Sequence, residues 1–310
     1  MHALHWILKR HKIYEPYLLA IDEELPPFSD LKQCIWIALA LMGSRLTFNR
    51  LLLSRAERWV QTASLEHRKK AYKLLEEIWV TAGGLVLAIW AWSAASQGNP
   101  ACRLWSLGEC LRGWPLVPMP SEIVLYYNVE LGWYIHLLLK HVVGYGTPDG
   151  RDMHLHHWAS LLLLLLSFAY NGATVGAYVL ALLNLSNPVL HLAKIANEQG
   201  WPVARKVTFA CFAVTFFVSR VVVFPVTILQ FGWVQAHKVL PEVANELWWP
   251  YYVFNALLLL LYMLQLQWML GIARLLRRAF SQNFEAAGKM ANSVDPTLRK
   301  PRDPHKSKHT

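Results

Sequence analysis

The chain alternates long apolar stretches with short polar segments that are rich in basic residues. A hydrocarbon layer of ~30 Å is crossed by about 20 helical residues. The stretches long enough for this are 33–53, 78–95, 123–143, 157–173, 175–196, 207–231 and 251–273. The first is the weakest, because Arg45, Asn49 and Arg50 interrupt it. The pattern predicts an all-α, polytopic membrane helix bundle with about seven transmembrane helices.

The composition favours the same class. Of the 310 residues, 55% are hydrophobic and 16% are charged, whereas soluble domains carry roughly 25% charged residues. The 15 tryptophans and 12 tyrosines suit the aromatic belts that form where helices leave the lipid. The first 27 residues mix histidine, lysine and acidic side chains, and they lack the continuous apolar core of a cleavable signal peptide.

The distribution of basic residues predicts the orientation. Of the 30 Lys and Arg residues, 20 lie in the connecting segments on the side of the C-terminal tail, and 7 lie on the side of the N-terminus. Cytosolic segments retain the excess of Lys and Arg, so we expect a lumenal N-terminus and a cytosolic C-terminus. The net charge of +10 is expected to contact anionic lipid. No interleaved base-reading motif is present, so we expect no nucleic acid partner.

Four segments follow from these patterns. They are a lumenal N-terminal segment at 1–32, two transmembrane helices with their loops at 33–120, a helical core at 121–280, and a disordered basic cytosolic tail at 281–310. Lys306 and Lys308 lie five and three places from the end of the tail, counted inclusively. They resemble the dilysine signal that returns membrane proteins to the endoplasmic reticulum, and the alternative is a chance pairing in a basic tail.

Two of the four cysteines share one connecting segment. Cys102 and Cys110 lie in the loop at 97–121, which we expect to be lumenal. An oxidising lumen permits a disulfide there, but the sequence leaves open whether the two are joined. Cys34 and Cys211 lie inside apolar runs and are expected to be inert.

A histidine cluster opens the fourth apolar stretch, as Met153-His154-Leu155-His156-His157-Trp158. Ionisable groups at membrane depth are costly, so each is a candidate functional group. Neighbouring helix positions point ~100° apart, and Ser160 lies one turn after His156 on the same face. A neutral imidazole can act as a general base or a nucleophile near neutral pH. The alternative is an interfacial cluster that anchors the helix end.

Two other chemistries are disfavoured. Membrane di-iron enzymes need several histidine boxes, and this chain has one such cluster, so we expect no metal and no bound cofactor. A serine hydrolase needs a nucleophile turn, and the sequence contains no G-x-S-x-G.

The fifth apolar stretch carries polar residues at helical spacing: Asn184, Asn187, His191 and Lys194. Steps of three or four place them on one face, which must be turned away from lipid because unsatisfied polar groups cost several kcal/mol there. Such a stripe either lines a wet cavity or supplies hydrogen bonds between helices. Pro188 is expected to bend this helix and to free the Asn184 carbonyl.

Glu130 is, in this interpretation, the only carboxylate well inside a span. Its expected partner is one of the histidines or Arg220 of the sixth stretch. The alternative to a functional role is a purely structural ion pair.

These residues resemble the TLC-domain family, and within it the ceramide synthases. The family pattern opens with a His-His pair, here His156-His157, and continues through a turn, here Asn171-Gly172-Ala173. Its next helix follows a pattern like L-H-D-x-S-D-x-x-L-E-x-A-K, which is similar to residues 182–194. Further matching segments lie on both sides: Glu130-Leu131-Gly132-Trp133-Tyr134, Ser219-Arg220 with Phe224-Pro225, and 251–258 with Trp268 and Arg274.

The resemblance implies a TLC-type fold and an enzyme of the endoplasmic reticulum membrane. Ceramide synthases transfer the fatty acyl group of an acyl-CoA to the amine of a sphingoid base. Membrane lipids, acyl-CoA and a sphingoid base are therefore the expected partners, with acyl-CoA as co-substrate. One residue of the pair His156-His157 is expected to be acyl acceptor or base, with the other in support. A homodimer is compatible with the sequence, which does not set the oligomeric state.

The signature helix departs from the family pattern. Its two aspartates are replaced by Asn184 and Asn187, and its glutamate by His191. An amide can orient a histidine but cannot balance the charge of an imidazolium, and in a serine-protease triad the same change lowers the rate ~10⁴-fold. His191 is a candidate substitute base and Glu130 a candidate substitute acid. We favour the acyltransferase. The alternative is a TLC-domain protein that binds, senses or transports lipids without catalysis.

Overall fold

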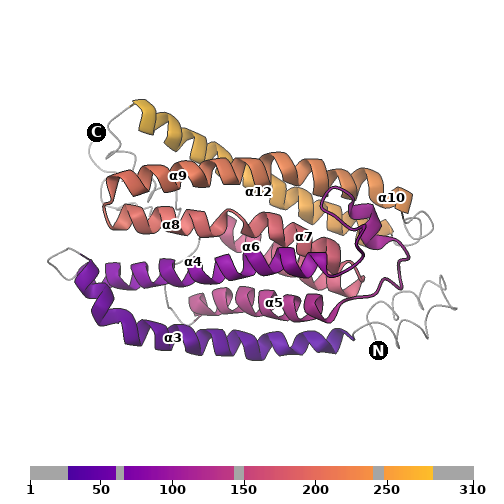
Figure 1. Cartoon of the computed structure of the whole chain (residues 1–310), viewed down its shortest axis with the longest axis horizontal. Coiled ribbons are helices and arrows are strands. Elements are labelled where there is room, and N and C mark those ends of the chain that lie inside the picture. Colours follow the sequence, from indigo (N-terminus) through magenta and orange to yellow (C-terminus); the bar gives the residue numbers. More distant parts are fainter. Residues whose placement is uncertain (1–26, 61–65, 143–149, 240–247, 282–310) are drawn as a thin grey trace, which may run out of the picture.

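The computed structural model describes residues 27–60, 66–142, 150–239 and 248–281. Within these ranges the regular elements are helices that lie side by side along one direction (Figure 1). The principal ones are α3 (Gln33–Trp59), α4 (Glu66–Ser96), α5 (Ser121–Val142), α6 (Arg151–Ala169), α7 (Ala173–Asn184), α8 (Asn187–Glu198), α9 (Pro202–Phe216), α10 (Ala236–Val239) and α12 (Trp248–Ser281).

The helices pack into one bundle. α3 lies against α4 and α5, α4 against α7 and α8, α8 against α9, and α12 against α6. Aromatic and leucine side chains of α5, α6 and α7 form the centre of the core, with Tyr126, Tyr127 and Phe168 fully buried. The expected all-α membrane bundle is confirmed.

Successive helices can form one continuous stretch, here called a rod. Four rods of the described residues are long and apolar enough to cross a membrane by themselves. They are Arg68–Ser96, Ala173–Glu198, Pro202–Gln235 and Trp249–Arg277. The count of about seven spans therefore stays a prediction, and the protein is a multi-pass membrane protein.

α4 begins earlier than the apolar pattern indicated. The predicted span started at residue 78, whereas α4 starts at Glu66. Glu76 and Glu77 are consequently buried within the helix. The interpretation of Glu130 as the only carboxylate inside a span was therefore wrong. The apolar window excluded the two glutamates, whose cationic partners come from other helices: Arg45 of α3 and Lys140 of α5 pair with Glu76, and Lys194 of α8 pairs with Glu77.

The rod formed by α7 and α8 is interrupted where Pro188 was expected to bend it. α7 ends at Asn184 and α8 begins at Asn187. Proline has no backbone N–H and clashes with the carbonyl four residues before it, which here belongs to Asn184. As the second residue of α8, Pro188 occupies a position where the missing N–H breaks no helical hydrogen bond.

The rod that follows α9 is wider than an α-helix. It continues as three π-helical segments, η4 (Phe217–Val223), η5 (Pro225–Leu229) and η6 (Phe231–Gln235), before α10. Pro225 cannot donate the hydrogen bond that an α-helix needs at that position. π-Helical turns inside α-helices are frequent at functional sites, and η4 carries the buried Arg220.

The segment between α4 and α5 folds over one end of the bundle. It contains the short helix η3 (Leu107–Leu111), and a disulfide joins Cys102 to Cys110. The question that the sequence left open is thus answered in favour of the bond. Asn171, which has a positive φ of 53°, donates from Nδ2 to the carbonyls of Pro115 and Val117 at 2.8 Å each. These bonds attach the segment to the turn between α6 and α7.

Candidate functional site

A chain of polar side chains crosses the centre of the bundle. Asn184 Nδ2 donates to Glu130 Oε1 at 3.0 Å, and Asn187 Nδ2 donates to Asn184 Oδ1 at 3.3 Å. Arg220 donates to Asn187 Oδ1 at 2.6 Å and to the Leu183 carbonyl. The link therefore runs from the guanidinium on η4, through two amides on α7 and α8, to the carboxyl group on α5. We refer to Arg220, Asn187, Asn184 and Glu130 as the amide relay.

The direction of the amide relay is fixed by chemistry. A guanidinium has no acceptor, so the oxygen of Asn187 must face Arg220. The NH₂ group of Asn187 then faces Asn184, whose own NH₂ group faces Glu130. Every donor points from the cation toward the carboxyl group. The expected direct contact of Glu130 with a histidine or with Arg220 is wrong: two amides stand between the two charged groups.

The His-His pair lies beside the amide relay. His156 and His157 are each 8% exposed, and their ring centroids are 5.8 Å apart. The His156 ring packs on Trp268 of α12 at 5.4 Å, and the His157 ring packs on Tyr134 of α5 at 5.7 Å. Both imidazoles thus face protein rather than lipid, as predicted from the cost of exposing them.

Electrostatic contacts connect the pair to the amide relay. The charge of Arg220 acts on the His156 imidazole. The Tyr134 side chain lies within electrostatic range of Glu130 and Arg220. Helices α5, α6 and η4, with α7 and α8, therefore bring together most of the residues that the sequence singled out.

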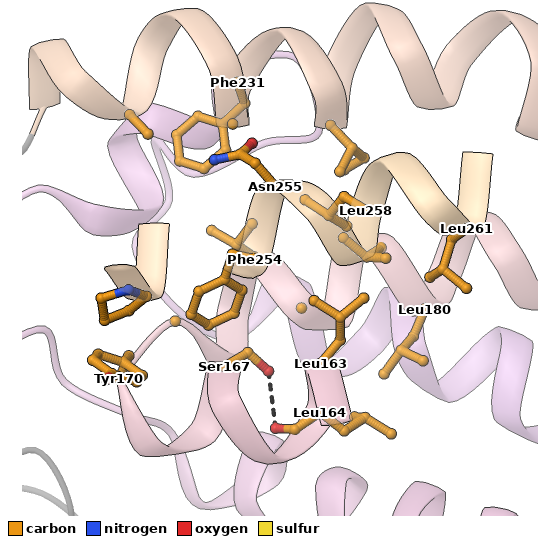
Figure 2. A pocket seen from close by; sticks show the side chains of 18 of the residues that line it. Leu163, Leu164, Ser167, Tyr170, Leu180, Phe231, Phe254, Asn255, Leu258 and Leu261 are labelled. Carbon is orange, nitrogen blue, oxygen red and sulfur yellow. Dashed lines mark hydrogen bonds between the residues drawn. The ribbon is translucent and has the colours of Figure 1, made fainter. Parts of the chain in front are cut away.

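An apolar cavity of about 200 Å³ begins at this centre. Figure 2 shows its wall, with leucines and aromatic rings from α6, α7, the π-helical rod and α12 turned toward one another. Ser160 and Leu183 line it, as do Tyr170 and Tyr251. Two polar groups of the wall have partners within the protein: Tyr127 Oη and Ser167 Oγ are 3.0 Å apart, and each is also within hydrogen-bond distance of a backbone carbonyl, of Ala173 and of Leu164 respectively.

The cavity extends along the helices. Ser160 and Tyr170, which both line the cavity, lie ten residues apart along α6 and the residue that follows it. At 1.5 Å per residue this separation is roughly 15 Å. This is about half the hydrocarbon thickness of a bilayer. His156 precedes Ser160 by one turn on the same face of α6. His156 therefore lies one helical turn from the Ser160 end of the apolar cavity, although neither histidine lines the cavity itself.

The remaining residues of the predicted polar stripe belong to a different cluster. His191 Nδ1 contacts Glu77 Oε2 at 2.5 Å, and Lys194 Nζ lies 3.6 Å from Glu77 Oε1. The break at Pro188 separates these residues from Asn184 and Asn187, and they face α4. The expectation of one continuous stripe was therefore wrong. His191 and Lys194 tie α8 to α4 and do not join the amide relay.

Sequence reasoning missed three contributors to these clusters. Tyr134 follows Glu130 by four residues, so helical spacing alone could have placed it on the same face. Trp268 was noted for its resemblance but not as a contact of His156. Glu77 precedes the predicted start of the second span at residue 78 and was not singled out, and only the pairing with α8 reveals its role.

Lys306 and Lys308 lie outside the described residues. Over the ranges that the structure describes, no three His, Cys, Asp or Glu side chains gather as metal ligands. The expectation of a site without metal or bound cofactor stays a prediction.

Comparison with known proteins identifies the family. The model of the TLC domain matches residues 73–274, which is well over half of the chain. The chain belongs to the TLC-domain family. The matched range begins within α4, ahead of the core expected at 121–280, and it includes every residue of the amide relay and the His-His pair.

The relatives include ceramide synthases of animals and plants. The chain is 29% identical to ceramide synthase 5 of Mus musculus over 57% of its own length and 42% of the relative. It is 28% identical to ceramide synthase 3 of Homo sapiens, over 72% of the chain and 57% of the relative. It is 29% identical to ceramide synthase LOH2 of Arabidopsis thaliana, over 50% of the chain and 53% of the relative. The chain is thus a ceramide-synthase-like member of the family that aligns with about half the length of these proteins.

Proposed function

We propose that this protein is an N-acyltransferase of the endoplasmic reticulum membrane that joins the acyl group of an acyl-CoA to the amine of a sphingoid base. The observation that carries the proposal is the buried pair His156-His157 about one helical turn from Ser160, at one end of the apolar cavity. The cavity suits a lipid chain. Among the described side chains His136, His156 and His157 are the buried imidazoles, and of these His156 lies one helical turn before Ser160, which lines the cavity.

The reaction exchanges one acyl bond for another. The amine nitrogen bonds to the acyl carbonyl carbon, the carbon–sulfur bond of the thioester breaks, and the amine proton leaves with CoA as its thiol. A histidine can carry that proton as general base, or can first accept the acyl group on nitrogen. His156 is the better placed for either role, because it shares a face with Ser160 at the cavity. His157, held against Tyr134, supports it.

The apolar wall contributes to the same chemistry. Acyl transfer to an amine competes with hydrolysis, and a site that excludes water suppresses hydrolysis. Leucines of α6, α7 and α12 line one part of the cavity, and the rings of Tyr170 and Phe254 line another (Figure 2). The bound acyl chain itself would fill this space and keep water from the carbonyl carbon.

Purified protein incubated with labelled acyl-CoA and a sphingoid base tests the proposal. We expect ceramide, and we expect His156→Ala to lower its formation by about 10²- to 10⁴-fold, the usual worth of a positioned base. His157→Ala should also lower it. His154→Ala is the matched control, because it lies on the same helix and is less buried. Folded wild-type protein that makes no amide with any chain length or amine would refute the proposal.

A second candidate is a lipid-binding, sensing or transport protein without acyl transfer. The observation that favours it is the replacement of both family aspartates by Asn184 and Asn187, whose amides are committed to the amide relay. This candidate predicts that the purified protein binds acyl chains and that His156→Ala leaves binding unchanged, with no ceramide formed by either.

The proposed location rests on the tail and on the cysteines. Lys306 and Lys308 resemble a dilysine retrieval signal, and the Cys102–Cys110 disulfide supports a lumenal position for the segment between α4 and α5. A tagged protein with Lys306→Ser and Lys308→Ser should leave the endoplasmic reticulum for later compartments. Unchanged location in that variant would remove the tail signal from the argument.

A further inference from the structure

The far end of the lipid cavity is closed by a segment that is not part of the bundle. The cavity begins near Ser160 in the middle of α6, and Tyr170 and Gly172 mark its other end at the turn after that helix. Leu111 and Trp114 also line it, and both belong to the segment between α4 and α5. We refer to residues 97–120 as the cap.

The cap is held in place by several independent contacts. Trp114 Nε1 donates to the Tyr170 carbonyl at 2.8 Å, and Tyr178 Oη donates to the Cys102 carbonyl at 3.2 Å. Helix η3 packs against α7, α10 and η6, all of which border the cavity. The Cys102–Cys110 disulfide closes η3 onto the start of the cap. The cap is therefore a fixed wall and not a loose covering.

We propose that Leu111 and Trp114 set the longest acyl chain that this protein accepts, an inference that rests on the proposed function for its reacting group. A chain whose carbonyl carbon lies near His156 enters the cavity past Ser160 and runs toward the cap. Its end meets the Trp114 indole, which is oriented by the hydrogen bond to the Tyr170 carbonyl. Methylenes beyond that point find no space, so affinity falls where the cavity ends.

Two substitutions move this wall in opposite directions. Trp114→Ala removes the indole and lengthens the cavity, whereas Leu111→Trp adds a ring and shortens it. Each methylene that gains buried space should raise affinity about fourfold. Trp105→Ala is the matched control, because Trp105 belongs to the same cap, is 70% exposed and does not line the cavity.

The test measures a chain-length cut-off in two ways. Thermal stabilisation of the purified protein by saturated fatty acids that differ by two carbons gives the cut-off for binding. Ceramide formed from the matching acyl-CoA thioesters gives the cut-off for transfer. We expect Trp114→Ala to move both cut-offs to longer chains, Leu111→Trp to move both to shorter chains, and Trp105→Ala to move neither.

The outcomes separate this inference from the proposed function. A binding cut-off that moves in protein without ceramide formation would support the cap and refute the acyltransferase. Ceramide formation with cut-offs unchanged in both cap variants would refute the cap alone. If Trp114→Ala does not fold, Leu111→Trp still decides, because a cut-off unchanged by a larger side chain at that position contradicts the proposal.

Discussion

Replacing Asn184 by aspartate restores the residue of the family pattern, and the amide relay predicts that this change is harmful. Asn184 donates to Glu130 at 3.0 Å and accepts from Asn187 at 3.3 Å. An aspartate keeps the acceptor and loses the donor. Two carboxyl groups then face each other where Glu130 is 1% exposed and residue 184 is 6% exposed.

The magnitude follows from two costs. The first cost is the loss of the hydrogen bond from residue 184 to Glu130, because a hydrogen bond to a charged group contributes about 1.5–3 kcal/mol to stability. In addition, one of the two buried carboxyl groups has to take up a proton, because like charges so close cannot both ionise. We expect Asn184→Asp to lower the free energy of unfolding by about 2–4 kcal/mol. For a chain of 310 residues this corresponds to a fall on the order of 3–6 °C in the unfolding midpoint.

A second variant supplies the control. In the double variant Glu130→Gln with Asn184→Asp, the Gln amide donates to the new carboxylate, which also accepts from Asn187. The net charge of the site is unchanged and each donor again has an acceptor. The double variant should be more stable than Asn184→Asp alone, measured by intrinsic tryptophan fluorescence of detergent-solubilised protein on heating. The reasoning fails if Asn184→Asp alone melts with the wild type, or if the double variant recovers nothing.

Two further predictions concern packing and the second polar cluster. Gly83→Ala would place a methyl carbon less than 3.0 Å from Cη2 of Trp133, so it should lower the free energy of unfolding by about 1–3 kcal/mol. Gly43→Ala meets open space and should be neutral or slightly stabilising. Equal effects of the two variants in thermal unfolding would contradict this packing. Glu77→Gln removes the carboxylate at 2.5 Å from His191 and should lower the free energy of unfolding by about 1–3 kcal/mol while leaving most acyl transfer. A complete loss of ceramide formation would instead place Glu77 in the chemistry.

The sequence predicted the helices and the burial of the polar residues because both follow from the cost of polar groups in lipid. Backbone groups must be satisfied within a helix, and side chains such as Glu130, Asn184 and His156 must face protein. These three are buried in the structure. The interruption at Pro188 was also predictable, because it depends only on the missing N–H and on the clash with the preceding turn.

The partners of those side chains were not predictable from periodicity. Spacing along one helix gives the face on which a residue lies, but not the depth at which that face meets another helix. Glu130 was therefore assigned to a histidine or to Arg220, whereas it accepts from Asn184. His191 was assigned to the same stripe as Asn184, although it pairs with Glu77 across a different interface. The cavity was equally unpredictable, because its wall combines residues from α5, α6, α7, the π-helical rod, α12 and the cap.

The exchange of aspartate for asparagine changes what the centre of the bundle can do with a proton. An aspartate can hold a charge or a proton, whereas an amide in the relay holds its own hydrogens in fixed donor positions and can take up neither. Hydrogen bonding between α5, α7 and η4 therefore survives the exchange, since Arg220 still reaches Glu130 through two amides. The two amides cannot pass a proton along that path. The proposed proton transfer at this centre therefore rests on the imidazoles of His156 and His157, and the histidine variants, rather than the asparagine variants, test it.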